Sequence, residues 1–300
     1  MSLQIDNNTI FKIGESLRDV NKPLKDRFRN LFTLKNINNE QAISEIAKSF
    51  KDSSALFKHE LAYCLGQMKN ALAIPILTEV LSDESQEAIV RHEAAEAIGA
   101  IGLFTSLPLL EAYRDHKIVE IAETCDIAID RIKWLQTQQS EPSNSYQSVD
   151  PAPPMEIKST SELADILLNE KKKLFDRYSA MFSLRDKGGD LEVLALCKGL
   201  KCKSALFRHE IAFVLGQMAH PLSIDSLKET LENKQEHGMV RHECAEALGA
   251  IATSECFEIL NKYLQDDERV VRESCDIALD MYDYENSDQF QYADGLAKHV

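Results

Sequence analysis

The chain has 300 residues, 44% of them hydrophobic, which is enough to bury one large core or two smaller ones. Its 49 acidic side chains outnumber the 34 basic ones and give a formal net charge of −15. This charge argues against nucleic acid, whose phosphates would be repelled, and favours a cationic partner or bound cations.

Nothing in the sequence indicates export or a membrane anchor. No run approaches the roughly 18 consecutive apolar residues of a membrane helix, and the N-terminal segment lacks the charged start and apolar core of a secretory signal. The seven cysteines lie in apolar helical segments and are expected to be reduced core thiols. We therefore expect a soluble, cytoplasmic protein without a membrane partner.

The first strongly patterned element spans residues 54–68, with the sequence SALFKHELAYCLGQM. Its apolar residues Leu61, Cys64, Leu65 and Met68 fall at positions i, i+3, i+4 and i+7. This spacing predicts a helix with one apolar stripe directed toward a core.

A second element, 90–102 (VRHEAAEAIGAIG), follows at a regular distance, since His92 lies 33 residues after His59. Further steps of 33 in each direction reach related segments at 24–28 and 125–128, so this part of the chain holds four repeats. A period near 33 without strand-like alternation is typical of helix-turn-helix units in solenoids of the HEAT or tetratricopeptide kind.

Residues 137–160 interrupt this helical pattern. Half of the eight prolines lie here, namely Pro142, Pro151, Pro153 and Pro154, among many serines and glutamines. Proline removes backbone donors and blocks helix continuation, so the segment is predicted to be a partly extended, mobile linker. The expected organisation is an N-terminal repeat half at 1–136, the linker at 137–160 and a C-terminal repeat half at 161–300.

The second half of the chain repeats the first at a distance of 150 residues. Residues 204–218 (SALFRHEIAFVLGQM) are identical to 54–68 at 11 of 15 positions, and 240–252 (VRHECAEALGAIA) matches 90–102. The chain is therefore an internal duplication. The predicted fold is all-α, an α-solenoid of eight HEAT-like helical-hairpin repeats in two four-repeat halves that face each other.

Only the two middle repeats of each half carry a His-Glu dipeptide. The four pairs are His59-Glu60, His92-Glu93, His209-Glu210 and His242-Glu243. Burying an imidazole beside a carboxylate four times would cost free energy unless a bound cation compensated it. Equivalent helices of consecutive repeats pack about 8–10 Å apart, so their histidines can converge on one ion. All eight side chains are candidate metal ligands.

Two histidines and at least one carboxylate in each half form the N,N,O ligand set that is typical of non-haem Fe(II), with positions left open for O₂. Zinc would accept the same ligands. A structural zinc site in a reduced protein usually uses cysteine thiolates, however, and no two cysteines here form a CxxC pair. The ligand types therefore favour iron.

Three further sets of residues lie close to the His-Glu pairs in the sequence or align with them. Glu96 and Glu246 lie four residues after His92 and His242, on the same helical face, where they either orient the imidazoles or are ordinary surface acids. Asp-Arg pairs align with the His-Glu pairs in the outer repeats at 26–27 and 176–177, and Cys125 and Cys275 also align there. Capping and packing are the expected roles of these outer residues.

The repeat architecture and the strings around the His-Glu pairs resemble the deoxyhypusine hydroxylase family. The strings are FKHEL at 57–61, VRHE at 90–93, FRHE at 207–210 and VRHE at 240–243. The resemblance covers essentially the whole chain, and all eight His and Glu positions are present. It implies an O₂-dependent di-iron monooxygenase of the cytoplasm that hydroxylates the deoxyhypusine side chain of the translation factor eIF-5A precursor to form hypusine.

The resemblance also implies roles for individual residues. The iron ligands for two Fe(2+) ions per chain would be His59, His92, Glu93, His209, His242 and Glu243, while Glu60 and Glu210 would be further ligands or catalytic groups that bind the substrate. The implied partners are the eIF-5A precursor, O₂ and a reductant. An acidic site suits deoxyhypusine, because its long side chain carries positively charged amines.

Two other functions are compatible with the sequence. A non-catalytic HEAT-repeat scaffold would bind protein partners and contain no metal. A zinc-dependent hydrolase would contain zinc and lack the visible absorption of an oxygenated di-iron centre. Metal analysis and the visible spectrum distinguish these three functions.

Overall fold

The computed structural model describes residues 5–138, 144–156 and 158–299. Within these residues the chain is helical and contains no β-strand. The α-helices of the first half are α1 (Asn7–Arg18), α2 (Leu24–Ile37), α3 (Glu40–Ala47), α4 (Ala55–Gln67), α5 (Ile74–Ser82), α6 (Ala88–Ile101), α7 (Leu107–Tyr113) and α8 (Val119–Leu135). Those that follow are α9 (Thr160–Leu168), α10 (Leu174–Lys187), α11 (Asp190–Gly199), α12 (Ala205–Met218), α13 (Ile224–Glu232), α14 (Gly238–Ile251), α15 (Ser254–Lys262), α16 (Arg269–Glu285) and α17 (Gly295–His299). Short 3₁₀ helices lie at Lys48–Lys51, Ala71–Ala73, Phe104–Ser106 and Pro221–Ser223.

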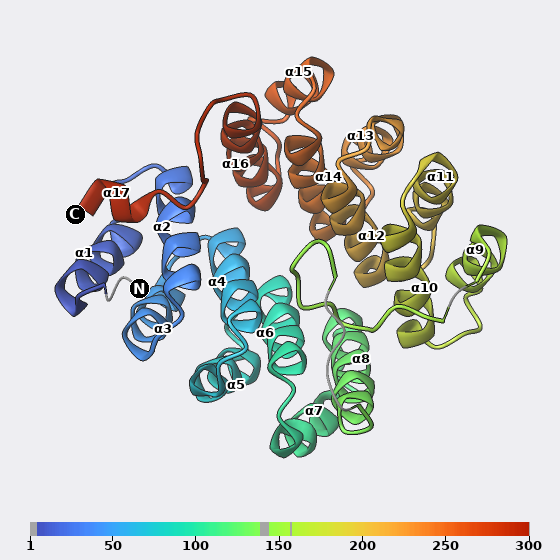
Figure 1. The fold of residues 1–300 in the computed structure, drawn as a ribbon, viewed down its shortest axis with the longest axis horizontal. Coiled ribbons are helices and arrows are strands. Elements are labelled where there is room, and N and C mark those ends of the chain that lie inside the picture. Colours follow the sequence, from blue (N-terminus) through green and yellow to red (C-terminus); the bar gives the residue numbers. More distant parts are fainter. Residues whose placement is uncertain (1–4, 139–143, 157, 300) are drawn as a thin grey trace. The chain divides into compact units, whose positions relative to one another are not determined.

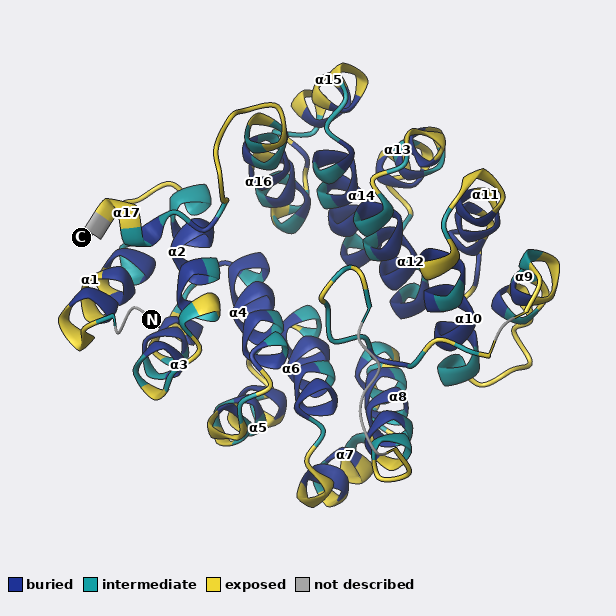
Figure 2. Cartoon of the chain, in the orientation of Figure 1, coloured by how far each residue is buried: buried dark blue, intermediate teal, exposed yellow. Residues whose placement is uncertain are grey.

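Within each half, the helices α1–α8 and α9–α16 alternate along the chain between an outer and an inner row, as HEAT repeats do (Figure 1). Inner helices pack against one another, α4 on α6, α12 on α14, and α14 on α16. Figure 2 shows that these inner helices are mostly buried, whereas α5, α11, α13 and α15 expose one side. The all-α repeat fold predicted from the 33-residue period is confirmed. None of the helices in the described part of the chain combines the length and the apolar character required to cross a membrane.

The chain forms two compact units. Unit 1 comprises the described residues of Met1–Ile132 and Asp288–Val300, and unit 2 comprises those of Lys133–Ser287. The described residues from 288 to 299 thus belong to the unit of the N-terminal repeats, although they follow the second set of repeats in the sequence. The backbone N–H of Gly295 donates to Thr33 Oγ1 at 3.0 Å, and Arg29 donates to the side chain of Gln289 at 2.9 Å.

Two glycines allow the central inner helices to approach each other closely. A Cβ atom added at Gly66 of α4 would lie 2.8 Å from Cα of Ala97 on α6. A Cβ atom at Gly216 of α12 would lie 3.0 Å from Cα of Ala247 on α14. The first distance is shorter than real Cβ contacts and the second is tighter than most of them, so the absence of a Cβ atom favours this close packing.

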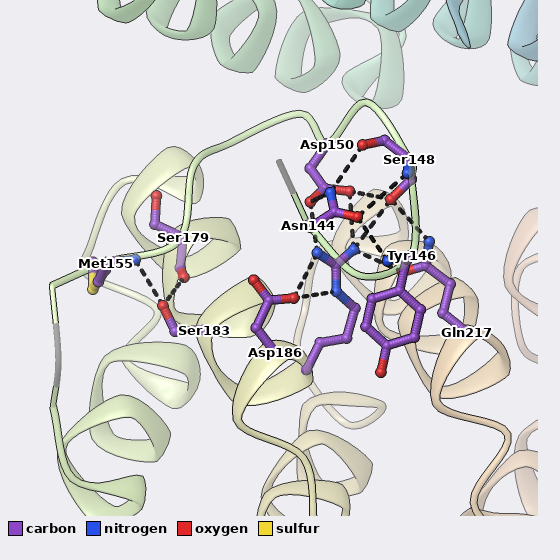
Figure 3. Close-up of polar contacts among 10 residues, drawn as sticks. Asn144, Tyr146, Ser148, Asp150, Met155, Ser179, Ser183, Asp186 and Gln217 are labelled. Atoms are coloured by element: carbon purple, nitrogen blue, oxygen red, sulfur yellow. Dashed lines mark hydrogen bonds and ion pairs between the residues drawn. The ribbon is translucent and has the colours of Figure 1, made fainter. Parts of the chain in front are cut away.

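The described part of the linker is anchored to unit 2, whereas the sequence predicted mobility. Both carboxylate oxygens of Asp150 accept hydrogen bonds from Arg185, at 2.9 and 2.7 Å, and the Arg185 side chain is fully buried. The guanidinium carbon lies 4.6 Å from the centre of the Tyr146 ring, and Ser148 and Gln217 complete the cluster (Figure 3). A bidentate pair of this kind holds the segment against α10 and α12.

Candidate metal centre

Each unit brings together two of the predicted histidines and one of the predicted carboxylates. In unit 1, His59 on α4 meets His92 and Glu93 on α6, and their potential ligand atoms all lie within 4.8 Å of one another. His59 Nε2 is 3.2 Å from Glu93 Oε2, and the two imidazole centres are 5.6 Å apart. These three residues, here called the unit-1 group, are at most 5% exposed.

Unit 2 repeats this geometry at the positions 150 residues later. His209 Nε2 on α12 is 3.3 Å from Glu243 Oε2 on α14, and the ring centres of His209 and His242 are 5.3 Å apart. His242, Glu243 and Glu246 also have potential ligand atoms within 4.8 Å of one another. We call His209, His242 and Glu243 the unit-2 group, and its members are at most 6% exposed.

Local sequence fixes where the first helix of each pair begins. The side chains of Ser54 and Ser204 cap α4 and α12 by accepting the backbone N–H of Phe57 and Phe207, each at 3.0 Å. Serine is a preferred N-cap because its hydroxyl satisfies a backbone donor that the helix leaves free. Each cap sets the same register, with the first histidine of each unit in the second turn of its helix.

Buried arginines fix the second helix of each pair. Arg91, directly before His92, donates from Nε to the carbonyl of Leu81 at the end of α5, at 2.9 Å. Arg241, directly before His242, makes the same bond to Leu231 at the end of α13, at 2.8 Å. Each bond ties an inner helix to its outer neighbour and so limits the rotation of the inner helix that would move the histidine.

Glu60 and Glu210 directly follow His59 and His209 in the sequence. Both side chains are buried, with exposed fractions of 7% and 3%. They precede the apolar residues Leu61 and Ile211 on α4 and α12. Neither of the two groups defined above includes them. Burial of a carboxylate costs free energy, and a bound cation or a cationic group nearby lowers that cost.

The candidate ligand atoms suit an iron site better than they suit a metal site built from cysteine thiolates. Each group offers imidazole nitrogen and carboxylate oxygen, the combination that non-haem iron uses. Burial, together with the nearby charge of Glu60, raises the pKa of the Cys64 thiol, and burial with the charge of Glu243 does the same for Cys244. These thiols stay protonated near neutral pH and do not offer thiolates.

The cysteines and arginines of the outer repeats that align with the His-Glu pairs have packing roles in the structure. Burial raises the pKa of both Cys125 and Cys275 to about 12, and both side chains are fully buried, as expected for core residues. Arg27 and Arg177 donate to the carbonyls ending α1 and α9, each at 2.8 Å, and lie 4.1 Å from the centres of the Phe57 and Phe207 rings. The packing and capping roles predicted for these two arginines agree with these contacts.

The structure also places Ser274, which the sequence did not single out, close to His242. Glu246 Oε1 lies 3.4 Å from His242 Nδ1, and Ser274 on α16 donates to the same carboxylate oxygen at 2.9 Å. Glu246 was one of two candidates for orienting an imidazole, whereas Ser274 was missed. Its position 32 residues after His242, about one repeat later, places it on the neighbouring inner helix, but a serine at this position does not by itself indicate a contact with a carboxylate.

Known proteins resemble this chain along nearly its whole length. The HEAT-repeat family model matches residues 24–99, 41–123 and 193–280. Curated proteins named deoxyhypusine hydroxylase are 60% identical in Drosophila melanogaster, 53% in Mus musculus and 53% in Homo sapiens. The alignments with the first two proteins cover 98% of this chain and 98% of each relative. The alignment with the human protein covers 95% of this chain and 94% of the human protein.

A solved structure agrees with these sequence matches. The structure of human deoxyhypusine hydroxylase in complex with glycerol matches with a TM-score of 0.91 and 51% identity, covering 93% of this chain and 97% of that one. Identity at this level over nearly complete chains is far above what a shared repeat fold alone produces. The chain belongs to the deoxyhypusine hydroxylase family.

Proposed function

We propose that this chain is a di-iron, O₂-dependent monooxygenase that hydroxylates the deoxyhypusine side chain of the eIF-5A precursor to form hypusine. The observation that carries the proposal is the pair of buried His, His, Glu groups, which recur with nearly equal distances in both units. The activity for which the relatives are named, hydroxylation of deoxyhypusine, supplies the substrate of the proposal.

In this proposal the chain holds two Fe(II) ions, one at each group. The ligands are His59, His92 and Glu93 in unit 1, and His209, His242 and Glu243 in unit 2. Bound iron supplies the activation of O₂, which protein side chains cannot provide by themselves. The protein contributes a buried, preformed ligand set, so that little ordering is required when the metals bind.

Glu60 and Glu210 either complete the coordination or bind the substrate. The deoxyhypusine arm carries amines that are protonated at neutral pH, and a buried carboxylate would pair with such an amine and fix the distance of the target carbon from the metal. The net charge of −15 adds an attractive field for a cationic side chain.

The proposed reaction replaces one C–H bond of the substrate by C–OH. One oxygen atom of O₂ enters the product and the other leaves as water, which requires two electrons from an external reductant and two protons. The burial of both groups limits access of bulk water to the reacting carbon. A cytoplasmic location is part of the proposal, because all seven cysteines are buried and unpaired, as suits a reducing compartment.

The most direct test of the activity uses isotopically heavy O₂. The purified chain would be incubated with a deoxyhypusine-bearing substrate protein, ferrous iron and a reductant, and the modified peptide analysed by mass spectrometry. The proposal predicts that the product gains one oxygen atom that comes from O₂. Label that comes from heavy water instead, or no reaction in the presence of all components, would contradict a monooxygenase.

A further inference from the structure

The surroundings of His242 contain two polar side chains beyond the proposed ligands. Glu246 lies one turn later on α14, and Ser274 lies on α16, which packs directly against α14. Ser274 Oγ lies 2.9 Å from Glu246 Oε1 and 3.4 Å from His242 Nδ1, and Glu246 Oε1 lies 3.4 Å from the same nitrogen. His242 and Ser274 are fully buried, so these contacts are shielded from bulk water.

The number of available protons determines which atom donates and which accepts in each of these contacts. The Ser274 hydroxyl has a single proton, and its shortest contact is with Glu246 Oε1, so this proton is donated to the carboxylate. Ser274 Oγ and Glu246 Oε1 are then both acceptors where they face His242 Nδ1. A nitrogen that faces two acceptors carries the ring proton, and the lone pair of the imidazole is therefore on Nε2.

We infer that Ser274 and Glu246 are positioning residues for His242, which hold its imidazole in the Nδ1–H form and in one orientation so that Nε2 binds the metal of the unit-2 group. The inference rests on the proposed iron binding by His242. It adds that the affinity of this group depends on a hydroxyl from the next repeat. A hydrogen bond to the outer nitrogen of a histidine ligand fixes both the tautomer and the ring direction, and its loss typically lowers metal affinity about 10- to 100-fold.

Unit 1 uses the equivalent position differently. Thr124 lies 150 residues before Ser274, on α8, and its hydroxyl donates to the backbone carbonyl of Glu120 on its own helix at 2.8 Å. Its only hydroxyl proton is thus engaged within α8. The serine-to-carboxylate bond beside His242 is consequently a feature of unit 2, and removal of the Thr124 hydroxyl provides a matched control.

The test compares Ser274→Ala, Glu246→Ala and Thr124→Val with the unaltered full-length chain. Ferrous iron would be titrated anaerobically into each metal-free protein against a competing chelator. We expect the first two variants to bind one of the two ions about tenfold more weakly or worse, and Thr124→Val to bind both as the unaltered chain does. Glu246→Gln keeps an oxygen acceptor beside Nδ1 and should recover most of the lost affinity.

A second readout needs no metal. Imidazole ¹⁵N chemical shifts of the metal-free protein report which nitrogen carries the proton, and His242 is expected in the Nδ1–H form in the unaltered chain and as a tautomer mixture in Ser274→Ala and Glu246→Ala. Thermal unfolding of the metal-free variants identifies any that do not fold. For such a variant, the ring shifts of the unaltered chain decide the question, and an Nε2–H tautomer there would overturn the inference.

The control His242→Ala separates this inference from the proposed function. If His242→Ala keeps both irons with unchanged affinity, the ligand assignment fails and the proposed function fails with it. If His242→Ala loses one iron while Ser274→Ala and Glu246→Ala bind both ions normally, the positioning role alone is wrong. Equal losses in Thr124→Val and Ser274→Ala would also overturn the specific role in unit 2.

Discussion

The two units hold nearly identical ligand geometry in different surroundings. The His-to-Glu distances of the unit-1 and unit-2 groups are 3.2 and 3.3 Å, and the ring separations are 5.6 and 5.3 Å. Around these groups the duplicated positions have diverged. Arg27 pairs with Asp52, whereas position 202 in the second unit is a cysteine, and Arg241 pairs with Asp266, whereas position 116 in the first unit is a histidine.

This contrast indicates which parts of a duplicated repeat can change without loss of the site. Anchoring by an arginine tolerates different acidic or aromatic partners, because Arg27, Arg91, Arg177 and Arg241 each keep the bond from Nε to a carbonyl of the preceding outer helix. Ligand convergence tolerates little change, because a metal requires its donor atoms within about 0.2 Å of their ideal distances. Four comparisons between the units can break or sharpen this view.

The largest effect is expected from removing equivalent histidines. His59→Ala and His209→Ala should each lose one iron and reduce turnover to background, because each removes one of the few donors of its group. Iron content and product formation would be measured on both variants. Full turnover by one of them would break the equivalence of the two groups, since only one would then be required.

The next largest effect concerns Arg185, which anchors the described part of the linker in unit 2. Arg185→Ala leaves Asp150 buried without its counterion and should lower the free energy of unfolding by ~3–5 kcal/mol. Lys35 occupies the equivalent position in unit 1 and lies 5.4 Å from the centre of the Phe32 ring. Lys35→Ala should cost less than about 1 kcal/mol. Urea unfolding of both variants measures the two losses in the free energy of unfolding. Equal losses would show that the Arg185–Asp150 pair contributes no more stability than Lys35 does.

A smaller and symmetric effect is expected at the close helix contacts. Gly66→Ala and Gly216→Ala should each cost ~1–3 kcal/mol, because the added methyl group forces the paired helices apart. They should also weaken iron binding in their own unit. The double variant Gly66→Ala, Ala97→Gly removes the facing methyl group, 2.9 Å from the new Cβ, and should recover part of the loss. Thermal unfolding and iron titration would show whether the methyl group added at Gly66 and the one added at Gly216 lower stability and iron affinity equally.

The smallest effect is a pH dependence at the start of the repeats. A side-chain hydrogen bond from Thr9 lowers the pKa of the N-cap Asp6 from its ordinary value of 3.8. A lowered pKa means that this contribution to stability is complete above the unfolded value and is lost as the pH falls through the folded value. In unit 2, the equivalent helix α9 is capped by the hydroxyl of Ser159.

Asp6→Asn should therefore make unfolding less dependent on pH below about 4, because asparagine caps a helix without titrating in this range. Asn39→Asp, which introduces a carboxylate at the N-cap of α3, is the matched control and should increase the same dependence. Chemical unfolding at several acidic pH values would reveal both changes. If the free energy of unfolding changed with pH in both variants as it does in the unaltered chain, these N-cap residues would not contribute to stability in acid.

Periodicity explains why much of the molecule could be predicted from its sequence. The 33-residue spacing places His59 and His92 at equivalent positions on neighbouring inner helices, and packing of those helices then brings the imidazoles together. Gly66 recurs as Gly216 at the distance of 150 residues, and its close approach to Ala97 follows from the same packing. Such features depend on neighbouring repeats alone, which a sequence pattern records directly.

Contacts outside the repeat pattern could not be predicted in this way. Asp150 lies 35 residues before Arg185 in a proline-rich segment, and no periodic signal connects the two. The contact of Gly295 with Thr33 spans 262 residues and joins the end of the chain to its beginning. Ser274 lies in phase with the repeats, yet an isolated serine on a helix carries no sign that its hydroxyl meets a carboxylate.

Metal stoichiometry tests the central claim most directly. The chain would be produced with iron and zinc both available, and its metals quantified per folded chain before and after Glu93→Ala and Glu243→Ala are introduced singly and together. Two irons per unaltered chain, one in each single variant and none in the double variant are the predicted result. Zinc in place of iron, no bound metal, or two irons retained in the double variant would contradict it.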